Sequence, residues 1–458
     1  MAIATINPTT GLTEKEFDSI DATEIERRLA LAHETYMALR DTTFEQRAGW
    51  MRASADLLEL DVDSLARILT IEMGKPIAQA RAEVLKCAKG LRFYAANAED
   101  FLADVELANA DSVGASRAWT RFEPLGVLLS VMPWNFPLWQ VIRFAAPALM
   151  AGNTGLLKHA SNVPQSALYL DTLFARGGFP AGAFQTLLIG SGPVDAIVRD
   201  HRIKGVALTG SEPAGRSVAS SAGAEIKKLV LELGGSDPFI VMPSADLGRA
   251  ASTAATARLG NNGQSCIAAK RFIVHTDVYD EFAELFTAHI AAAVVGDPLD
   301  EATTVGPLAT EAGRNDLAEL VDDAVAKGAV VRTGVPTSLT DGWFYTPTVL
   351  EGVDETMRLF QEEAFGPVAV LYRVADAAEA LALANGTTFG LSSAVWTTDS
   401  ADEDFFVRGI DAGAVFINGM TISYPELPFG GIKNSGYGRE LGAPGIREFC
   451  NLKTVWKG

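Results

Sequence analysis

The sequence has few of the residues that build disulfide frameworks and metal sites. It contains 3 cysteines and 5 histidines in 458 residues. The cysteines lie far apart, at Cys87, Cys266 and Cys450, and none stands at a metal-ligand spacing from a histidine. A small, odd number of cysteines is typical of a reducing compartment. We therefore expect a cytoplasmic protein with no disulfide framework and no metal ion.

The sequence also lacks an excess of positive charge. It has 38 Lys and Arg against 57 Asp and Glu, a net charge of −19. Because nucleic acids and anionic membranes bind basic surfaces, we expect neither as a partner. The N-terminal residues lack the basic segment and apolar core of a secretory signal. One uncharged stretch, Pro124–Ile142, is interrupted by prolines and polar residues, and we interpret it as a strand, a loop and a helix.

The apolar patterns that are present predict an α/β protein. At 48% apolar and 21% charged residues, the composition is that of an ordinary soluble globular protein. Helical periodicity covers residues 24–39, 45–60 and 76–98. Over residues 126–233, and again after residue 235, short apolar runs alternate with helical patterns. This alternation predicts two doubly wound domains, each with a parallel sheet covered by helices.

One cysteine lies in a glycine-rich turn. Cys266 ends the segment Gly-Asn-Asn-Gly-Gln-Ser-Cys, where small neighbours leave it free to face a pocket. Such a cysteine is a candidate nucleophile, although the commoner fate of an isolated cysteine is a buried structural position. Cys87 and Cys450 lie in helical or mixed surroundings, and we interpret both as structural.

Two polar residues follow apolar strands. Glu232 ends an apolar run just before two glycines. An unpaired carboxylate there has a raised pKa and suits a general base, and the alternative is a residue that caps the next turn. Asn135 lies between Pro133 and Pro137, which fix its amide as a candidate oxyanion donor. The alternative for Asn135 is an ordinary turn residue.

Two strand ends lead directly into helices. They are Leu-Lys-His-Ala-Ser at residues 157–161 and Leu-Thr-Gly-Ser at residues 208–211. The N–H groups at the start of a helix suit phosphate binding, and the alternative is an ordinary strand-to-helix connection. Neither stretch contains Gly-x-Gly-x-x-Gly or the P-loop pattern, so these residues alone name no cofactor.

Taken together, these segments resemble the motifs of the aldehyde dehydrogenase superfamily, in the same order and at similar spacing. The motifs are PWNFP (133–137), LLKHAS (156–161), TGS (209–211), LELGG (231–235), GQSC (263–266), EEAFGP (362–367) and PFGGIKNSGYG (428–438). The resemblance runs from Asn7 to Lys453. Within the superfamily the chain is most similar to the bacterial NADP-linked succinate-semialdehyde dehydrogenases.

The resemblance implies an aldehyde dehydrogenase fold with two Rossmann-like domains and a small oligomerisation element. Residues 1–234 would form the cofactor-binding domain, interrupted by an oligomerisation hairpin near residues 108–125. Residues 235–421 would form the catalytic domain that carries the nucleophile. Residues 422–458 would return to the first domain and take part in oligomerisation. We expect a homodimer or a homotetramer.

The resemblance also assigns catalytic roles. Cys266 would attack the aldehyde to form a thiohemiacetal. The Asn135 amide and the Cys266 N–H would stabilise the oxyanion. After hydride transfer, Glu232 would activate the water that hydrolyses the thioester. The expected reaction is the oxidation of succinate semialdehyde to succinate.

By the same resemblance, a further set of residues lines the cofactor cleft. They are Trp134, Asn135, Lys158, Ser161, Gly210, Ser211, Leu233, Glu363 and Phe365. NAD-preferring relatives often carry Glu where this chain has Ser161, which does not repel a 2′-phosphate. Lys158 supplies a local positive charge. We therefore expect NADP as the cofactor, with NAD as the weaker alternative.

The resemblance identifies the residues that bind the substrate less completely than those that bind the cofactor. Arg143 resembles an arginine that grips the substrate carboxylate in succinate-semialdehyde dehydrogenases, and the alternative is an ordinary ion pair. Ser423 is a candidate second contact. Some relatives carry another arginine where this chain has Gly260, which leaves substrate identity open. Ala268 cannot form the redox disulfide that some relatives use.

Three other functions compete with this one. The first is oxidation of another carboxylated or small aldehyde, such as glutarate semialdehyde. The second is a CoA-acylating dehydrogenase, but such enzymes lack the general base that Glu232 resembles. The third is a non-catalytic descendant of the fold, against which Cys266, Glu232 and Asn135 together argue.

Overall fold

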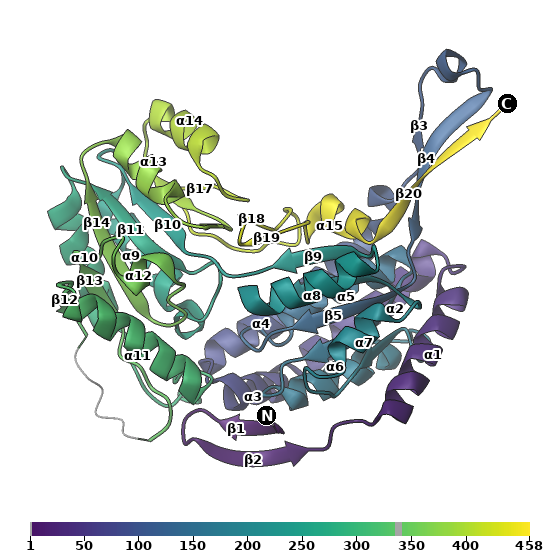
Figure 1. Cartoon of the computed structure of the whole chain (residues 1–458), viewed down its shortest axis with the longest axis horizontal. Helices are drawn as coiled ribbons and strands as arrows, with labels where there is room; N and C mark the ends of the chain where they lie inside the picture. The colour runs from purple at the N-terminus through teal and green to yellow at the C-terminus, as the bar shows by residue number, and fades with distance from the viewer. Residues whose placement is uncertain (1, 335–340) are drawn as a thin grey trace.

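The computed structural model describes residues 2–334 and 341–458 and contains two mainly parallel sheets (Figure 1). The sheets lie in two lobes, and a long arm of antiparallel strands projects away from one of them. The expected α/β class with two doubly wound sheets is confirmed. None of the helices in these described ranges is long and apolar enough to cross a bilayer.

The first sheet has six strands in the order β19-β9-β8-β5-β6-β7. Their bounds are β5 Val127–Met132, β6 Thr154–His159, β7 Phe184–Thr186, β8 Ile203–Thr209, β9 Lys228–Glu232 and β19 Gly436–Tyr437. All neighbours are parallel except β19, which pairs antiparallel with β9. The register places Met132 opposite His159, and Thr209 opposite Glu232. The carboxyl ends of these strands therefore meet at one edge, where doubly wound sheets bind ligands.

Helices cover both faces of this sheet. They are α1 Ala22–Leu39, α2 Phe44–Leu60, α3 Val62–Met73, α4 Ile77–Phe101, α5 Trp139–Ala151, α6 Pro164–Arg176, α7 Val194–Arg199, α8 Glu212–Ala224 and α15 Gly442–Glu448. Every residue of α5 is buried, so this helix has no polar face for a periodicity argument to detect. The stretch 124–142 is a strand, a loop and the start of α5, as expected.

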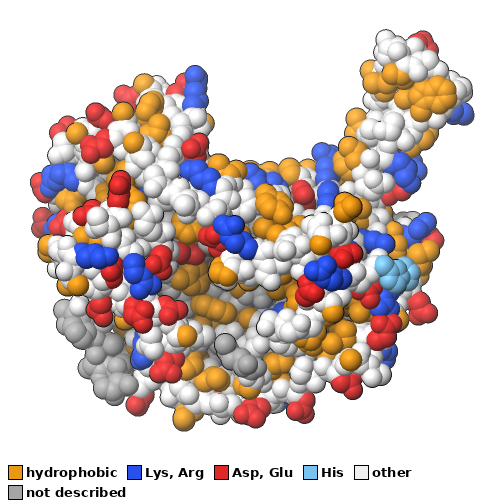
Figure 2. Space-filling model, in the orientation of Figure 1, with side chains coloured by type: hydrophobic (Ala, Val, Ile, Leu, Met, Phe, Trp, Pro, Cys, Tyr) orange, Lys and Arg blue, Asp and Glu red, His pale blue; other side chains and the backbone are white. Residues whose placement is uncertain are grey.

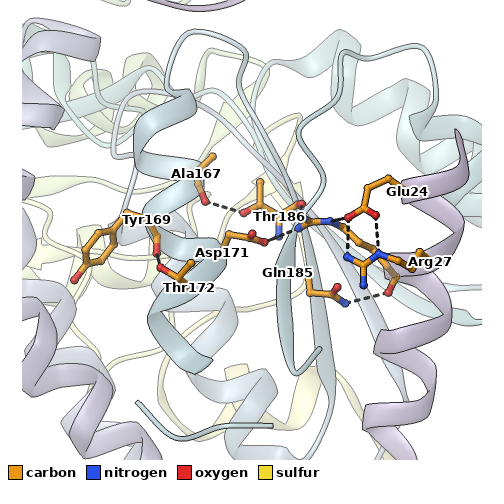
Figure 3. Close-up of polar contacts among 9 residues, drawn as sticks. Glu24, Arg27, Ala167, Tyr169, Asp171, Thr172, Gln185 and Thr186 are labelled. Atoms are coloured by element: carbon orange, nitrogen blue, oxygen red, sulfur yellow. Dashed lines mark hydrogen bonds and ion pairs between the residues drawn. The ribbon is translucent and has the colours of Figure 1, made fainter. Parts of the chain in front are cut away.

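Helix α1 is fastened to the β7 edge of the sheet by polar contacts (Figure 3). The Arg28 guanidinium donates to Asp171 Oδ1 and to the Thr186 carbonyl, both at 2.7 Å. In return, Gln185 Nε2 donates to the Arg28 carbonyl at 3.0 Å. The Thr186 hydroxyl donates to the carbonyl of Ala167 in α6 at 2.8 Å. These hydrogen bonds join the N-terminal helix α1, the edge strand β7 and helix α6 to one another.

The second sheet has seven strands in the order β12-β13-β14-β11-β10-β16-β17, parallel except for the pair β12 and β13. Their bounds are β10 Asp237–Val241, β11 Ala269–His275, β12 Val330–Thr333, β13 Thr348–Glu351, β14 Val368–Val374, β16 Ala394–Trp396 and β17 Phe416–Ile417. Its helices are α9 Leu247–Leu259, α10 Tyr279–Ala291, α11 Glu311–Ala326, α12 Arg358–Gln361, α13 Ala377–Asn385 and α14 Ser400–Gly409. A 3-10 turn, η2 Gly260–Gly263, follows α9 and leads to Cys266.

The projecting arm is a three-stranded antiparallel sheet. It consists of β3 Val105–Glu106, β4 Arg117–Pro124 and β20 Cys450–Lys457, with the turn η1 Ala110–Val113 at its tip. Val105, Leu452 and Trp456 are exposed on it, and hydrophobic side chains gather near its tip in Figure 2. Two small antiparallel pairs complete the fold, the hairpin β1 Ile3–Asn7 with β2 Leu12–Phe17, and the long-range pair β15 Phe389–Gly390 with β18 Ile432–Lys433.

Candidate active site

Cys266 lies where two cavities meet. A cavity of about 270 Å³ is lined by Pro133, Trp134, Asn135, Gln140, Thr209, Gly210, Ser211, Leu233, Gly234, Cys266, Glu363 and Phe365. A second cavity of about 220 Å³ shares Cys266 and Gln140 with the first and also includes Lys75, Lys86, Arg143 and Ser423. We call the first the strand-edge cavity and the second the basic cavity. Cys266 therefore borders two separate cavities.

The turn before Cys266 has an unusual backbone. Asn261 and Asn262 both have φ of 58°, and Gly263 has φ of 73°. Asparagine tolerates this left-handed region better than other side chains do. A Cβ on Gly263 would lie 2.4 Å from the carbonyl oxygen of Gly366, so the backbones approach too closely for any other residue. The sequence Gly-Asn-Asn-Gly fits the tight turn that presents the cysteine.

Hydrogen bonds from Lys270 hold the loop that carries Cys266. The buried Lys270 ammonium donates to the carbonyls of Ser265 and Cys266 at 2.9 and 2.7 Å. It also forms an ion pair with Glu363 at 3.0 Å. The Cys266 N–H has no hydrogen-bond acceptor within the described part of the chain. That N–H is therefore free to donate to a ligand.

Asn135 is fixed beside this N–H donor. Its side chain is buried, with Oδ1 accepting from Gln140 at 3.0 Å and Nδ2 donating to the Gln264 carbonyl at 3.1 Å. An amide nitrogen carries two hydrogens, so one remains to donate. Because Asn135 and Cys266 line the same cavity, the structure brings the two predicted oxyanion donors together.

Glu232 is buried at the end of β9 and lines neither cavity. A Cβ on Gly430 would lie 2.7 Å from Glu232 Oε1, so the carboxyl group packs against that glycine. Neither carboxyl oxygen has a hydrogen-bond partner among the described residues. Burial, followed by the charge of Glu440, raises the pKa of Glu232 well above its ordinary value. The expectation of a raised pKa agrees with this environment.

Arg143 lies in the wall of the basic cavity, but its guanidinium already has a partner. It forms a buried ion pair with Glu440, donates to the Thr209 hydroxyl at 3.2 Å and lies 4.8 Å from the centre of the Phe429 ring. This arrangement is the ion-pair alternative for Arg143. Glu440 was not predicted, because residues 297 positions apart show no pairing signal in one sequence.

The cofactor residues predicted from the sequence fall into two groups. Trp134, Gly210, Ser211, Leu233, Glu363 and Phe365 line the strand-edge cavity, with the Trp134 and Phe365 rings 5.7 Å apart. Lys158 and Ser161 do not line it but lie at the end of β6, beside the β5 strand that leads to Trp134. Burial lowers the pKa of Lys158, whose ammonium has no acidic partner among residues 2–334 and 341–458.

Ser423 lies in the wall of the basic cavity together with two residues that the sequence did not single out. Its hydroxyl accepts from Lys86 Nζ at 2.9 Å and from Trp139 Nε1 at 2.8 Å. Lys86 belongs to α4 and looks in sequence like one more charged residue of an amphipathic helix. No group of three or more metal-ligating side chains occurs in the described ranges.

The chain belongs to the aldehyde dehydrogenase family, which it matches over residues 1–455. It is 62% identical over 456 residues to a succinate-semialdehyde dehydrogenase [NADP(+)] of Mycobacterium tuberculosis, covering 100% of both chains. It is also 62% identical over 459 residues to the NADP-dependent enzyme of Mycobacterium avium, covering 100% of this chain and 97% of that one. The solved succinic semialdehyde dehydrogenase of Streptococcus pyogenes with NADP+ superposes with a TM-score of 0.96, at 36% identity over 99% of both chains.

The environment of the thiol predicts a strong pH dependence of its reactivity. Burial raises the pKa of Cys266 to about 12, outweighing the nearby Arg143 cation that lowers it. Only the thiolate is nucleophilic, so alkylation of the free protein by iodoacetamide should accelerate about tenfold per pH unit from about pH 6 to about pH 9. The measurement is the rate of label incorporation, with Cys266→Ser as the unlabelled control. A plateau below about pH 8 would show that a thiolate already exists in the free protein.

Proposed function

We propose that the protein oxidises succinate semialdehyde to succinate with NADP. The observation that carries this proposal is the wall of the basic cavity, which contains Lys75, Lys86 and Arg143 but no Asp or Glu among the described residues. In a chain of net charge −19, such a concentration of cations favours an anionic substrate. The cavity opens onto Cys266, where an aldehyde carbon reacts.

The first chemical step belongs to Cys266. Its thiolate attacks the aldehyde carbon, and the carbonyl oxygen becomes an oxyanion held by the Cys266 N–H and the Asn135 amide. These donors are fixed before the reaction, so no reorganisation is needed when the negative charge develops. Loss of one such donor typically slows catalysis by about 10²–10³-fold.

The strand-edge cavity fits the cofactor. Helix α8 begins at this cavity, and its N-cap Ser211 uses no side-chain cap, so N–H groups of the first turn are available for phosphate. Glu363 and Phe365 would hold the nicotinamide end, and Lys158 with Ser161 the 2′-phosphate end. When bound, NADP supplies the hydride acceptor that converts the thiohemiacetal into a thioester.

Glu232 would activate the hydrolytic water. Because neither carboxyl oxygen is hydrogen-bonded within the described residues, its side chain turns towards Cys266 without breaking a bond. Once exposed to solvent it would lose its own proton, and the resulting carboxylate would take a proton from the attacking water. The hydroxide then adds to the thioester carbon, and the Cys266 sulfur leaves as the acid product forms. Water is thus the acyl acceptor, in contrast to the CoA-acylating alternative.

Ser423 is the proposed contact of the distal carboxylate, and Arg143 is proposed to act on it through its charge. Ser423 offers a hydroxyl in the cavity wall, and Arg143 contributes positive potential even while it is paired with Glu440. A longer carboxylated aldehyde such as glutarate semialdehyde would use the same contacts. It is therefore the second candidate substrate.

We also propose that three segments of the chain have different functions. Residues 1–234 bind the cofactor, residues 235–421 carry Cys266, and residues 422–458 close the site and complete the arm. The exposed apolar side chains of the arm suit a contact with a second copy of the chain, in a homodimer or homotetramer. We place the protein in the cytoplasm because its cysteines are few and unpaired.

The proposed activity predicts a specific order of substrates and cofactors. In an absorbance assay of NADPH formation, succinate semialdehyde should have a kcat/KM about 10- to 100-fold above that of butanal, because only the former offers a carboxylate. NADP should be preferred to NAD. Cys266→Ser should remove all turnover and retain cofactor binding. Equal kcat/KM for both aldehydes would contradict the substrate assignment.

The role of Glu232 predicts a change of rate-limiting step. In Glu232→Gln, hydride transfer should persist as a rapid burst of NADPH, followed by turnover slowed roughly 10²–10⁴-fold, because the base acts after acylation. Rapid mixing followed by absorbance measures both phases. Disappearance of the burst would mean that Glu232 is already needed to form the thiolate.

The position of Ser161 predicts how the cofactor preference can be changed. Ser161→Glu should weaken NADP binding by about tenfold or more through repulsion of the 2′-phosphate, and should affect NAD far less. Ser161→Ala is the matched control, because it removes one hydrogen bond without adding charge and should cost only about 1 kcal/mol. Fluorescence titration of both cofactors measures the effect. Equal weakening of NADP and NAD would rule out this contact.

A further inference from the structure

The three cations of the basic cavity differ in how their charge is compensated. Lys75 forms a buried ion pair with Glu83, and Arg143 forms one with Glu440. Lys86 has no carboxylate partner in the described ranges of the chain. It is therefore the cation in this wall whose charge remains available to a ligand.

The surroundings of Lys86 hold its ammonium in place without neutralising it. Nζ lies 4.4 Å from the centre of the Trp139 ring and donates one hydrogen bond to Ser423 Oγ. A lysine ammonium has three hydrogens, so two remain for other acceptors. The aromatic face and the hydroxyl fix the direction of the side chain, which lowers the entropy cost of binding an anion.

The hydroxyl group of Ser423 is also oriented to donate a hydrogen bond. Its oxygen accepts from Lys86 Nζ and from Trp139 Nε1, and neither of these groups is able to accept in return. The Ser423 hydroxyl hydrogen must therefore point to a third atom, and no acceptor for it occurs among the described residues. A hydroxyl in a cavity wall with both lone pairs occupied is arranged to donate to an incoming oxygen.

We infer that Lys86 is the residue that carries the counter-charge for the distal carboxylate of the substrate, with the Ser423 hydroxyl binding the second oxygen. This inference rests on the proposed function and names the specificity residue of the same cavity. Arg143 then supports the site from behind, because its charge is already shared with Glu440.

The electrostatics of Lys86 agree with this geometry. Burial lowers the pKa of Lys86 to about 8, with Cys87 and Glu83 acting in the opposite direction and Arg143 and Lys75 in the same one. The ammonium is thus incompletely solvated in the free protein. A carboxylate bound beside it restores the charged form, because an adjacent opposite charge favours ionisation.

The test is a comparison of two lysine variants of the same helix. Lys86→Met should raise KM for succinate semialdehyde by roughly 10- to 100-fold and leave KM for butanal within about threefold. Lys86→Arg should restore part of the loss, because it keeps the charge. Lys89→Met is the matched control, since Lys89 forms only an exposed pair with Glu426 and should behave like wild type.

A second measurement does not depend on turnover. Succinate should slow the iodoacetamide labelling of Cys266 in the wild type and in Lys89→Met by occupying the basic cavity, and this protection should be lost in Lys86→Met. Thermal unfolding should show no loss of stability in Lys86→Met, because the substitution removes an uncompensated, partly buried charge.

The outcomes separate the inference from the function on which it rests. If KM rises equally for both aldehydes, or if succinate still protects Lys86→Met, the assignment of Lys86 is wrong while the proposed reaction stands. If the wild type does not oxidise succinate semialdehyde, the proposed reaction is wrong, and the succinate protection experiment still decides whether Lys86 binds the carboxylate.

Discussion

The arrangement of the site depends on one buried carboxylate, that of Glu83 in α4. Its Oε1 accepts from the Leu138 and Trp139 N–H groups at 2.9 and 3.0 Å, and its Oε2 pairs with Lys75. An acidic group at this position satisfies free N–H groups at the start of α5 and interacts favourably with the helix dipole. The start of α5 positions both Asn135, just before it, and Arg143, within it. Because these residues line the two cavities, the shape of both cavities depends on this contact. Breaking a buried pair of this kind typically costs about 3–5 kcal/mol.

Much of the fold could be predicted from the sequence because burial leaves a strong pattern. Strands of a parallel sheet are covered on both faces, and β5, β6, β8 and β9 were each visible as short apolar runs between helical segments. The order of the motifs along the chain then predicts which strand ends contribute residues to the active site. The structure brings Cys266 and Asn135 into one cavity, although Asn135 follows β5 of the first sheet and Cys266 precedes β11 of the second.

The rest could not be predicted, because it depends on contacts between residues far apart in the chain. The pairing of Arg143 with Glu440 and the hydrogen bond from Lys86 to Ser423 join α5 and α4 to the C-terminal segment. A single sequence shows a charged residue but not whether its charge is already neutralised. Arg143 and Lys86 differ in this respect, so the sequence predicts the arginine as a carboxylate contact and does not predict the lysine.

The burial of Glu232 bears directly on its proposed role as a base, because the group has no ion pair of its own within the described part of the chain. Burial favours its neutral form, and a neutral carboxyl group costs far less to leave without hydrogen bonds than a carboxylate does. Glu440, which shares Arg143, adds negative charge nearby and strengthens this preference. The proposed mechanism turns the side chain from Gly430 towards the cavities, where contact with water would lower its pKa. In the proposed mechanism Glu232 would thus be a carboxylate, able to accept a proton, when it lies beside the thioester, and a neutral acid in its buried position.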